Sequence, residues 1–259
     1  MKQKTTLQKQ NTGKPLTDPL TVMLLKDFLR PVLNLIASFR VPYRAIVEQP
    51  CCLLPGKPVI YAVNHFCFAN TPIVGRIVPK RSYILAGKQR LGLSDWLYFI
   101  LNGVIFVDRK DKADMAASKL AMSAYLRRGC SVVMFPAGTW NLTENQLTLS
   151  MKWGMIDIAK ETGAQIVPVV LEYDRESKRC FVRFGEAMIF SAEDSKAEAI
   201  TTLRDTMAAM RWEFWEQKGL FPRAELDLEV EQKKLFYSVE EYPPIDWEYE
   251  RSCIYHPYP

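Results

Sequence analysis

The sequence has little histidine, no Cys-x-x-Cys pair and no long apolar run. Only two histidines occur in 259 residues, and the six cysteines show no zinc-like spacing with either of them. A zinc site is therefore not expected, and we predict that the cysteines are reduced thiols of an intracellular protein, several of them buried.

No segment reaches the roughly 18 uncharged apolar residues that cross a bilayer. Charged residues interrupt the stretch at 20–36, and the run from Trp96 to Val107 is short and contains Asn102 and Gly103. The first twenty residues are polar, so we expect no cleavable signal peptide. We find no internal repeat and no motif that binds DNA or RNA, which leaves nucleic acid out of the predicted partners.

Basic charge is concentrated near the N-terminus, beside an apolar stretch. Residues 1–50 carry eight Lys/Arg against three Asp/Glu, whereas residues 221–259 carry four against nine. Residues 20–36 interleave large apolar side chains with Lys26 and Arg30, a pattern typical of a helix that lies in a membrane interface. An ordinary core-packing helix is the alternative. We expect attachment to an anionic membrane surface, at the cytoplasmic face of the cell membrane.

Strand patterns alternate with helix patterns along the chain, and a hydrophobic content of 48% supplies a sizeable core. This order predicts an α/β fold with a mixed, largely parallel sheet flanked by helices, preceded by an N-terminal amphipathic helical segment. Strands are expected at 41–47, 59–63, 131–135, 165–173 and 179–184. Helices are expected at 18–38 with a bend at Pro31, from 70 or 71 onward, from 111 or 114 to 128, at 152–162 and at 192–217. We divide the chain into a membrane-associating segment (1–50), a catalytic domain (51–220) and an acidic, aromatic extension (221–259).

His65 is the histidine best placed for chemistry, because the other, His256, lies in the C-terminal tail. It follows the apolar run Val59–Val63 and precedes a predicted helix, at the strand end where open α/β sheets place their sites. An imidazole there can act as a general base near neutral pH. A structural role for a single histidine is the alternative.

Four short motifs follow one another between residues 58 and 172. They are NHFCFAN at 64–70, GVIFVDR at 103–109, FPAGT at 135–139 and IVPVV at 166–170. In order and spacing they resemble the lysophosphatidic acid acyltransferase family of glycerophospholipid acyltransferases. The corresponding family patterns are N-H-x4-D, a phenylalanine two residues before Asp-Arg, F-P-E-G-T, and an apolar strand with a central proline.

The resemblance implies a reaction without metal or bound cofactor. His65 would take a proton from a hydroxyl of lysophosphatidic acid, glycerol-phosphate or a related lysophospholipid. That oxygen would attack the thioester of acyl-CoA or acyl carrier protein, while the residue at position 70 orients the imidazole. Such a protein takes part in phospholipid biosynthesis.

The resemblance also implies a site for the acceptor's phosphate, with Lys88 and Arg109 as its cations and a substrate-binding loop made of Phe135, Pro136, Ala137, Gly138 and Thr139. An arginine fork and a lysine point charge both suit a phosphate, and the loop could add backbone N–H donors. Lys152 matches a further family position less closely. Without the motif, Arg109 would be interpreted as a solvated charge.

Three positions depart from the family pattern. Asn70 stands in place of aspartate, Ala137 in place of glutamate, and Trp140 where arginine is usual. An amide cannot stabilise an imidazolium as a carboxylate does, and the same change in a serine-protease triad costs about 10⁴ in turnover. Asn70 could instead serve as a helix cap. The resemblance and these departures together imply either an impaired or repurposed natural relative, or a chain that carries deliberate inactivating substitutions.

Two competing hypotheses follow from these departures. One is a non-catalytic homologue that binds lipid or a partner protein. The other is a thioesterase or hydrolase that uses Cys67, two residues from His65, as its nucleophile. No third orienting group for such a pair is visible in the sequence, so a buried thiol is the simpler interpretation of Cys67.

Overall fold

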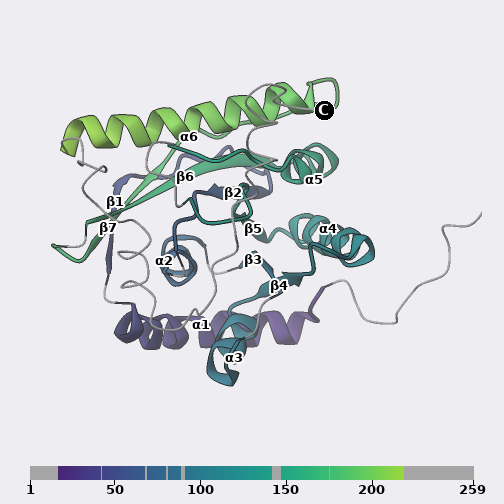
Figure 1. The fold of residues 1–259 in the computed structure, drawn as a ribbon. Coiled ribbons are helices and arrows are strands. Elements are labelled where there is room, and N and C mark those ends of the chain that lie inside the picture. The colour runs from purple at the N-terminus through teal and green to yellow at the C-terminus, as the bar shows by residue number, and fades with distance from the viewer. Residues whose placement is uncertain are drawn as a thin grey trace, which may run out of the picture.

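The computed structural model describes residues 17–218 except 42, 68, 80, 89–90, 142–146 and 175. The predicted extension at 221–259, His256 and Phe68 of the first motif lie outside the described residues. Figure 1 shows a central twisted sheet with helices packed on both of its faces.

Seven strands form one sheet in this part of the chain, in the order β1-β7-β6-β2-β5-β3-β4. Only the β6–β7 pairing is antiparallel. The predicted mixed, largely parallel sheet is therefore confirmed. The strands are β1 (Arg44–Gln49), β2 (Val59–Val63), β3 (Ser82–Gly87), β4 (Val104–Val107), β5 (Ser131–Met134), β6 (Gln165–Asp174) and β7 (Arg179–Phe184).

The helices bury apolar stripes against the two faces of the sheet. One face packs against α4, α5 and α6 in a core that includes Leu126, Ile158 and Leu203. The opposite face packs against α2, with α1 and α3 farther out (Figure 1). The helices are α1 (Leu20–Arg40), α2 (Asn70–Ile77), α3 (Leu93–Leu101), α4 (Lys112–Arg127), α5 (Gly154–Thr162) and α6 (Lys196–Lys218).

The strongly patterned elements match the expectations to within a few residues, including the fully buried β2. Asp111 caps α4 by accepting a hydrogen bond from the backbone N–H of Ala113 at 2.8 Å. The sequence patterns predict no element between residues 78 and 107, yet this segment forms β3, α3 and β4. The apolar run beginning at Trp96 is divided by Gly103, whose φ of +79° ends the helix and lets the chain turn into β4. The sheet also begins before residue 51, because β1 pairs with β7.

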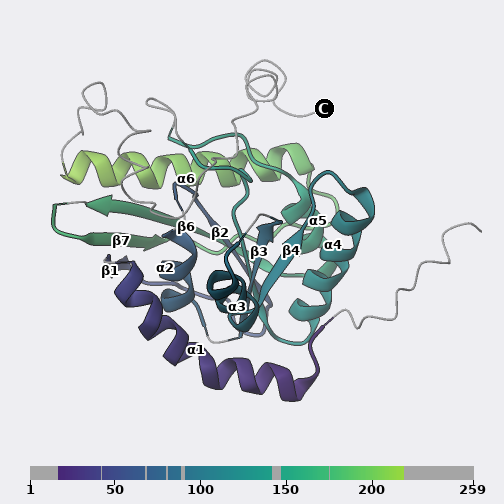
Figure 2. The same ribbon diagram turned by 60° about the horizontal axis from the view of Figure 1, so that its bottom comes forward.

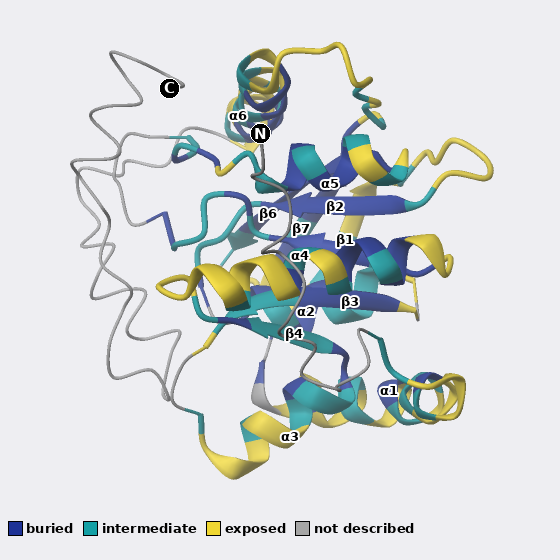
Figure 3. Ribbon diagram, turned by 90° about the vertical axis from the view of Figure 1, so that its right-hand side faces the viewer, coloured by how far each residue is buried: buried dark blue, intermediate teal, exposed yellow. Residues whose placement is uncertain are grey.

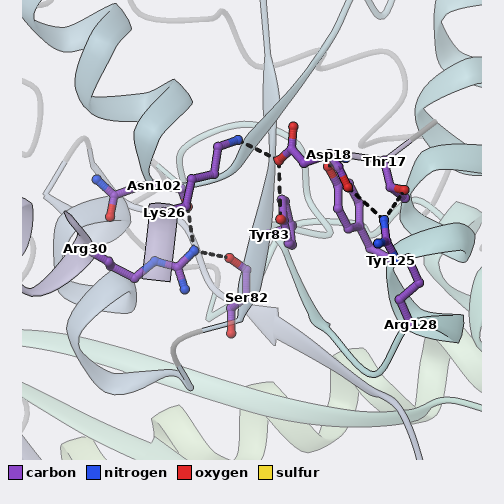
Figure 4. A network of polar contacts seen from close by, with 9 residues as sticks. All are labelled: Thr17, Asp18, Lys26, Arg30, Ser82, Tyr83, Asn102, Tyr125 and Arg128. Atoms are coloured by element: carbon purple, nitrogen blue, oxygen red, sulfur yellow. Dashed lines mark hydrogen bonds and ion pairs between the residues drawn. The ribbon is translucent and has the colours of Figure 1, made fainter. Parts of the chain in front are cut away.

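Helix α1 contains Pro31 and is bent, as expected (Figure 2). Its two internal cations point into the protein (Figure 4). Lys26 Nζ lies 2.7 Å from an Asp18 carboxylate oxygen. Arg30 is 5% exposed and donates to the carbonyl oxygens of Ser82 and Asn102 at 2.9 and 3.0 Å. Protein oxygens thus hold both cations, and attachment to an anionic membrane surface stays a prediction.

The outward face of α1 is apolar instead. Figure 3 shows exposed stretches of α1 and α3 at the same end of the molecule, away from α6. Phe28 and Phe39 are 77% and 83% exposed, and Leu93 of α3 is 73% exposed. We call this surface the apolar α1–α3 face; its other members are Leu20, Leu24, Leu25, Val32, Leu35, Ile36, Trp96 and Leu97. No helix within the described residues is long and apolar enough to span a bilayer.

Candidate active site

His65 lies just past the C-terminal end of β2, in the short connection to α2. Strand β5 pairs with β2 in parallel, so Phe135, which follows β5, arrives at the same edge of the sheet. The rings of His65 and Phe135 stack with centroids 4.1 Å apart. The first and third motifs therefore meet as parallel topology predicts.

Asn70 orients His65 through its amide oxygen. Asn70 Oδ1 accepts the backbone N–H groups of Phe66 and Cys67 at 2.9 and 2.7 Å, and it lies 3.1 Å from His65 Nδ1. Its Nδ2 donates to the Tyr173 hydroxyl at 3.1 Å. Two backbone donors identify the atom facing His65 as oxygen, so Nδ1 carries the imidazole proton and Nε2 carries the lone pair. This is the tautomer that a general base at Nε2 requires.

Asn70 does not cap α2. The N-cap is Ala69, and no side chain accepts a hydrogen bond from the first turn. Asn70 is instead fully buried and organises the loop that carries His65. The expectation of a cap at 70 or 71 is wrong, because the Asn70 carbonyl turns back toward the preceding loop.

Trp140 closes the other side of the imidazole. Its indole Nε1–H donates to His65 Nε2 at 2.9 Å, and the two rings meet edge-to-face. The bond agrees with the tautomer set by Asn70, since Nε2 must accept. It also occupies the lone pair that an acceptor hydroxyl would need.

The environment holds the His65 ring in its neutral form. Burial lowers the pKa of His65 to about 3; the contact with Asn70 raises it, and the nearby charge of Arg109 lowers it further. An aspartate at position 70 would oppose the effect of burial, and the amide does so only weakly.

Arg109 lies beside the loop of the third motif. It donates from Nη1 to the carbonyl oxygen of Gly138, and burial lowers the pKa of its guanidinium. Gly138 has a φ of +72°, and a Cβ there would come within 3.2 Å of Arg109 Nη1. Glycine is thus required both for the turn and for the approach of the guanidinium. The second and third motifs meet here, as the resemblance implies.

Lys88 is held apart from this cluster. Its ammonium lies 3.0 Å from an Asp114 carboxylate oxygen, and it is about half exposed. Asp114 also accepts the backbone N–H of Asp108, so Lys88 pairs with the start of α4. Its role as a phosphate ligand stays a prediction. The same holds for Lys152, whose backbone N–H donates to the carbonyl of Pro136 at 2.9 Å.

A small cavity of about 20 Å³ adjoins His65, with room for about one water. Pro136 and Ala137 from the predicted loop line it, and Thr139 continues that loop toward Trp140. The cavity is also lined by Arg211 of α6. No sequence pattern singles out Arg211, because a single arginine in a long helix usually marks a solvated face.

Cys67 is unsuited to be a nucleophile. It is fully buried in the core shared by α2 and the sheet. A nucleophilic thiol needs an accessible, electropositive setting, so the Cys67 hydrolase hypothesis is not supported by this geometry.

The chain is similar in sequence to known acyltransferases. Residues 44–172 match the family model described as Acyltransferase. The chain is 37% identical over 120 residues to a 1-acyl-sn-glycerol-3-phosphate acyltransferase of Borreliella burgdorferi, covering 46% of this chain and 47% of that relative. It is 25% identical over 122 residues to a lyso-ornithine lipid O-acyltransferase of Pseudomonas aeruginosa, covering 47% and 46%. The chain thus aligns with somewhat less than half of the length of each of these relatives.

The fold is also similar to that of a solved protein. The 1-acyl-sn-glycerophosphate acyltransferase PlsC of Thermotoga maritima superposes with a TM-score of 0.58 at 16% identity, covering 76% of this chain and 82% of that one. The motif geometry, the family model and the fold agree. Residues 44–172 therefore carry a domain of the family described as Acyltransferase, similar in sequence to a 1-acyl-sn-glycerol-3-phosphate acyltransferase and in fold to PlsC.

Proposed function

We propose that the protein transfers a fatty acyl group from a thioester to a hydroxyl of a lysophospholipid or of glycerol-phosphate. The observation that carries this proposal is the pair formed by His65 and Asn70, which presents a neutral imidazole with its lone pair on Nε2. The pair sits at the sheet edge beside Arg109 and the loop of the third motif. A base and a cation suited to binding a phosphate therefore lie close together.

The reaction assigns one task to each group. His65 Nε2 removes the proton from the acceptor hydroxyl as its oxygen attacks the thioester carbonyl carbon. Asn70 Oδ1 accepts the Nδ1–H throughout and holds the ring in place. When the C–S bond breaks, the imidazolium returns the proton to the thiolate that leaves. No net charge or proton is lost.

Arg109 is proposed to bind the acceptor's phosphate. A guanidinium can bind a phosphate through two parallel N–H···O hydrogen bonds. Acyl-CoA and acyl carrier protein are both proposed donors, because each presents the same thioester. Lysophosphatidic acid is the proposed acceptor for the first assays.

The rate is proposed to be lower than an aspartate at position 70 would allow. Asn70 supplies orientation without negative charge, and Ala137 contributes no carboxylate to the loop. The indole of Trp140 must also leave Nε2 before a hydroxyl can reach it. Asn70 and Trp140 act on the proton transfer, whereas Ala137 acts on the loop that would receive the acceptor.

The apolar α1–α3 face is proposed to dock on the cytoplasmic face of the cell membrane. Exposed apolar surface on this scale marks an interaction site, and interfacial helices bury such faces at the lipid boundary. The lipid acceptor would then reach the site from the bilayer. The ionic network behind α1 would hold the helix to the protein during docking (Figure 4).

The test is release of free thiol from acyl-CoA, or from acyl carrier protein, in the presence of lysophosphatidic acid, with the acylated product identified by mass spectrometry. We expect slow turnover that His65→Gln abolishes and that Asn70→Asp with Ala137→Glu accelerates. Absence of product from the natural sequence and from the double variant, with either donor, would refute the proposal.

A second candidate function is favoured by one observation, the bond from Trp140 to His65 Nε2. A relative that binds lysophospholipid without transferring acyl groups could keep its base permanently capped. That function predicts lysophospholipid binding to vesicle-bound protein that is unchanged in His65→Gln, with no product at any protein concentration.

A further inference from the structure

Arg211 is a fully buried cation at the wall of the cavity beside His65. Its side chain is 1% exposed. Its Nε donates to a carboxylate oxygen of Glu172 on β6, and its Nη1 donates to the carbonyl oxygen of Leu147. The guanidinium also lies over the Phe66 ring, 4.3 Å from its centroid. These three contacts together fix the position of the Arg211 guanidinium.

Nη2 of this guanidinium has no hydrogen-bond partner among the described residues, although it is buried. Leaving a charged donor unpaired in the interior is strongly unfavourable, so such groups are rare unless something binds there. Arg211 lines the same cavity as His65, Phe66 and Ala137. The guanidinium that carries these unpaired N–H groups therefore belongs to a residue in the wall of the cavity that adjoins the proposed base.

The surroundings indicate what kind of ligand fits. Glu172 already balances the charge of Arg211, so a phosphate would bring in a negative charge that nothing in this cavity offsets. The other walls are mostly apolar, and they include Val63, Pro136, Leu149 and Met151. The space suits a single oxygen atom. One charged donor, apolar walls and room for one oxygen fit a carbonyl oxygen better than a phosphate.

We propose that Arg211 is a further catalytic residue whose Nη2 donates a hydrogen bond to the carbonyl oxygen of the acyl thioester. When the acceptor oxygen adds to the carbonyl carbon, the C=O electron pair moves to this oxygen, and Arg211 stabilises the oxyanion. The pair returns to re-form C=O as the C–S bond breaks and the thiolate takes the proton from His65. Donors aimed at such an oxygen contribute rate because the charge develops only during the reaction. The assignment rests on the proposed acyl transfer.

The variant that tests it is Arg211→Met with Glu172→Gln, which removes the donor without leaving a buried carboxylate unpaired. The matched control is Arg183→Met with Glu48→Gln. Arg183 is also buried, donates to Glu48 at 2.9 Å and lies over Phe214, but it is not among the residues lining the His65 cavity. Loss of one oxyanion donor lowers kcat by about 10² to 10³. We expect that loss only in the Arg211 variant, with KM for the acceptor little changed and with both variants folded by circular dichroism.

A second measurement needs no turnover. Acyl-CoA and acyl carrier protein thioesters labelled with ¹³C at the carbonyl are bound without acceptor, and the C=O stretch is recorded by difference infrared spectroscopy. We expect a shift to lower frequency in the natural protein and in the Arg183 control, and none in the Arg211 variant. A shift without acyl transfer would retain the carbonyl subsite while refuting the proposed function. No shift with either donor, or a shift unchanged by the Arg211 variant, would overturn the assignment and leave a water as the occupant.

Discussion

The indole N–H of Trp140 donates to His65 Nε2 at 2.9 Å, on the side of the ring opposite Asn70. The imidazole is thus held between an acceptor at Nδ1 and a donor at Nε2, which together allow only one tautomer. The same bond stabilises the neutral ring and covers its basic nitrogen. Trp140 therefore supports the tautomer that Asn70 selects and competes with an incoming hydroxyl.

Trp140→Phe keeps an aromatic ring but removes the competing donor. We expect acyl transfer to rise by about fivefold, since the net value of such a hydrogen bond is about 1 kcal/mol. Initial rates measure this, and ¹⁵N NMR of the imidazole shows whether Nε2 loses its hydrogen bond. Trp96→Phe, on the exposed side of α3, is the control and should change neither. An unchanged rate together with an unchanged Nε2 resonance would contradict the competition.

Asn70→Asp places a carboxylate where the amide oxygen now lies, and the Tyr173 hydroxyl can turn to donate to its second oxygen. The negative charge favours the imidazolium, so the pKa of His65 should rise from about 3 toward its ordinary value. The rate should increase by up to about 10⁴. In the variant, kcat/KM should fall as pH drops through the new pKa, whereas the natural sequence should stay flat down to about pH 4. Rates between pH 4 and 9 decide this, with Asn70→Asp/His65→Gln as the inactive control.

The lowered pKa of His65 also predicts how stability depends on pH. Above the ordinary pKa of 6.5 both the folded and unfolded chains carry neutral His65, and its contribution is constant. Between 6.5 and about 3 only the unfolded chain binds the proton. As the pH is lowered across this window, the free energy of unfolding should therefore fall by about 1.4 kcal/mol for each pH unit. Urea unfolding at pH 7, 5 and 4 should show less pH dependence in His65→Gln than in the natural protein or in His256→Gln.

The apolar α1–α3 face predicts that membrane binding depends on its apolar side chains and not on Lys26 or Arg30. Phe28→Glu and Leu35→Glu should each weaken binding to vesicles at least tenfold, because each removes an apolar side chain worth about 1.5–3 kcal/mol when buried. Leu120→Glu on α4 is the matched control, since Leu120 is 53% exposed but lies on another helix. Cosedimentation with phospholipid vesicles measures the three variants. Equal binding by all of them would argue against this face as the docking surface.

Substitutions of Arg109 and of Lys88 should differ in their effect on KM for the acceptor. Arg109→Gln should raise KM for lysophosphatidic acid by at least tenfold, because a hydrogen bond between charged groups is worth about 1.5–3 kcal/mol. The same variant should leave KM unchanged for monoacylglycerol, which has no phosphate. Lys88→Gln should have a smaller effect, since Lys88 is already paired with Asp114. Equal losses with both acceptors would show that Arg109 acts only by holding Gly138.

Much of the fold follows from local patterns in the chain. The buried apolar runs at 59–63 and 131–134 form β2 and β5, and Asp111 begins α4 as expected. The segment 78–107 was missed because its apolar residues are shared between a short helix and two short strands. A turn at Gly103, with positive φ, separates two of these elements. In runs this short, hydrophobic periodicity cannot distinguish a helix from a strand.

The sequence by itself determined the family, the alternation of strands and helices, and the candidate base His65, since motif order and strand ends are local properties. Only the tertiary structure decided which atom of Asn70 faces His65, where Trp140 lies and which way the cations of α1 point. Trp140 and the cations of α1 depend on partners distant in sequence, such as Ser82 for Arg30. The Asn70 oxygen is identified by the nearby backbone N–H groups of Phe66 and Cys67, and distant Tyr173 holds the amide nitrogen. Arg211 is the clearest case. Arg211 reaches the His65 cavity only because α6 folds back over the edge of the sheet where His65 and Glu172 lie. These two residues are 146 and 39 residues away along the chain.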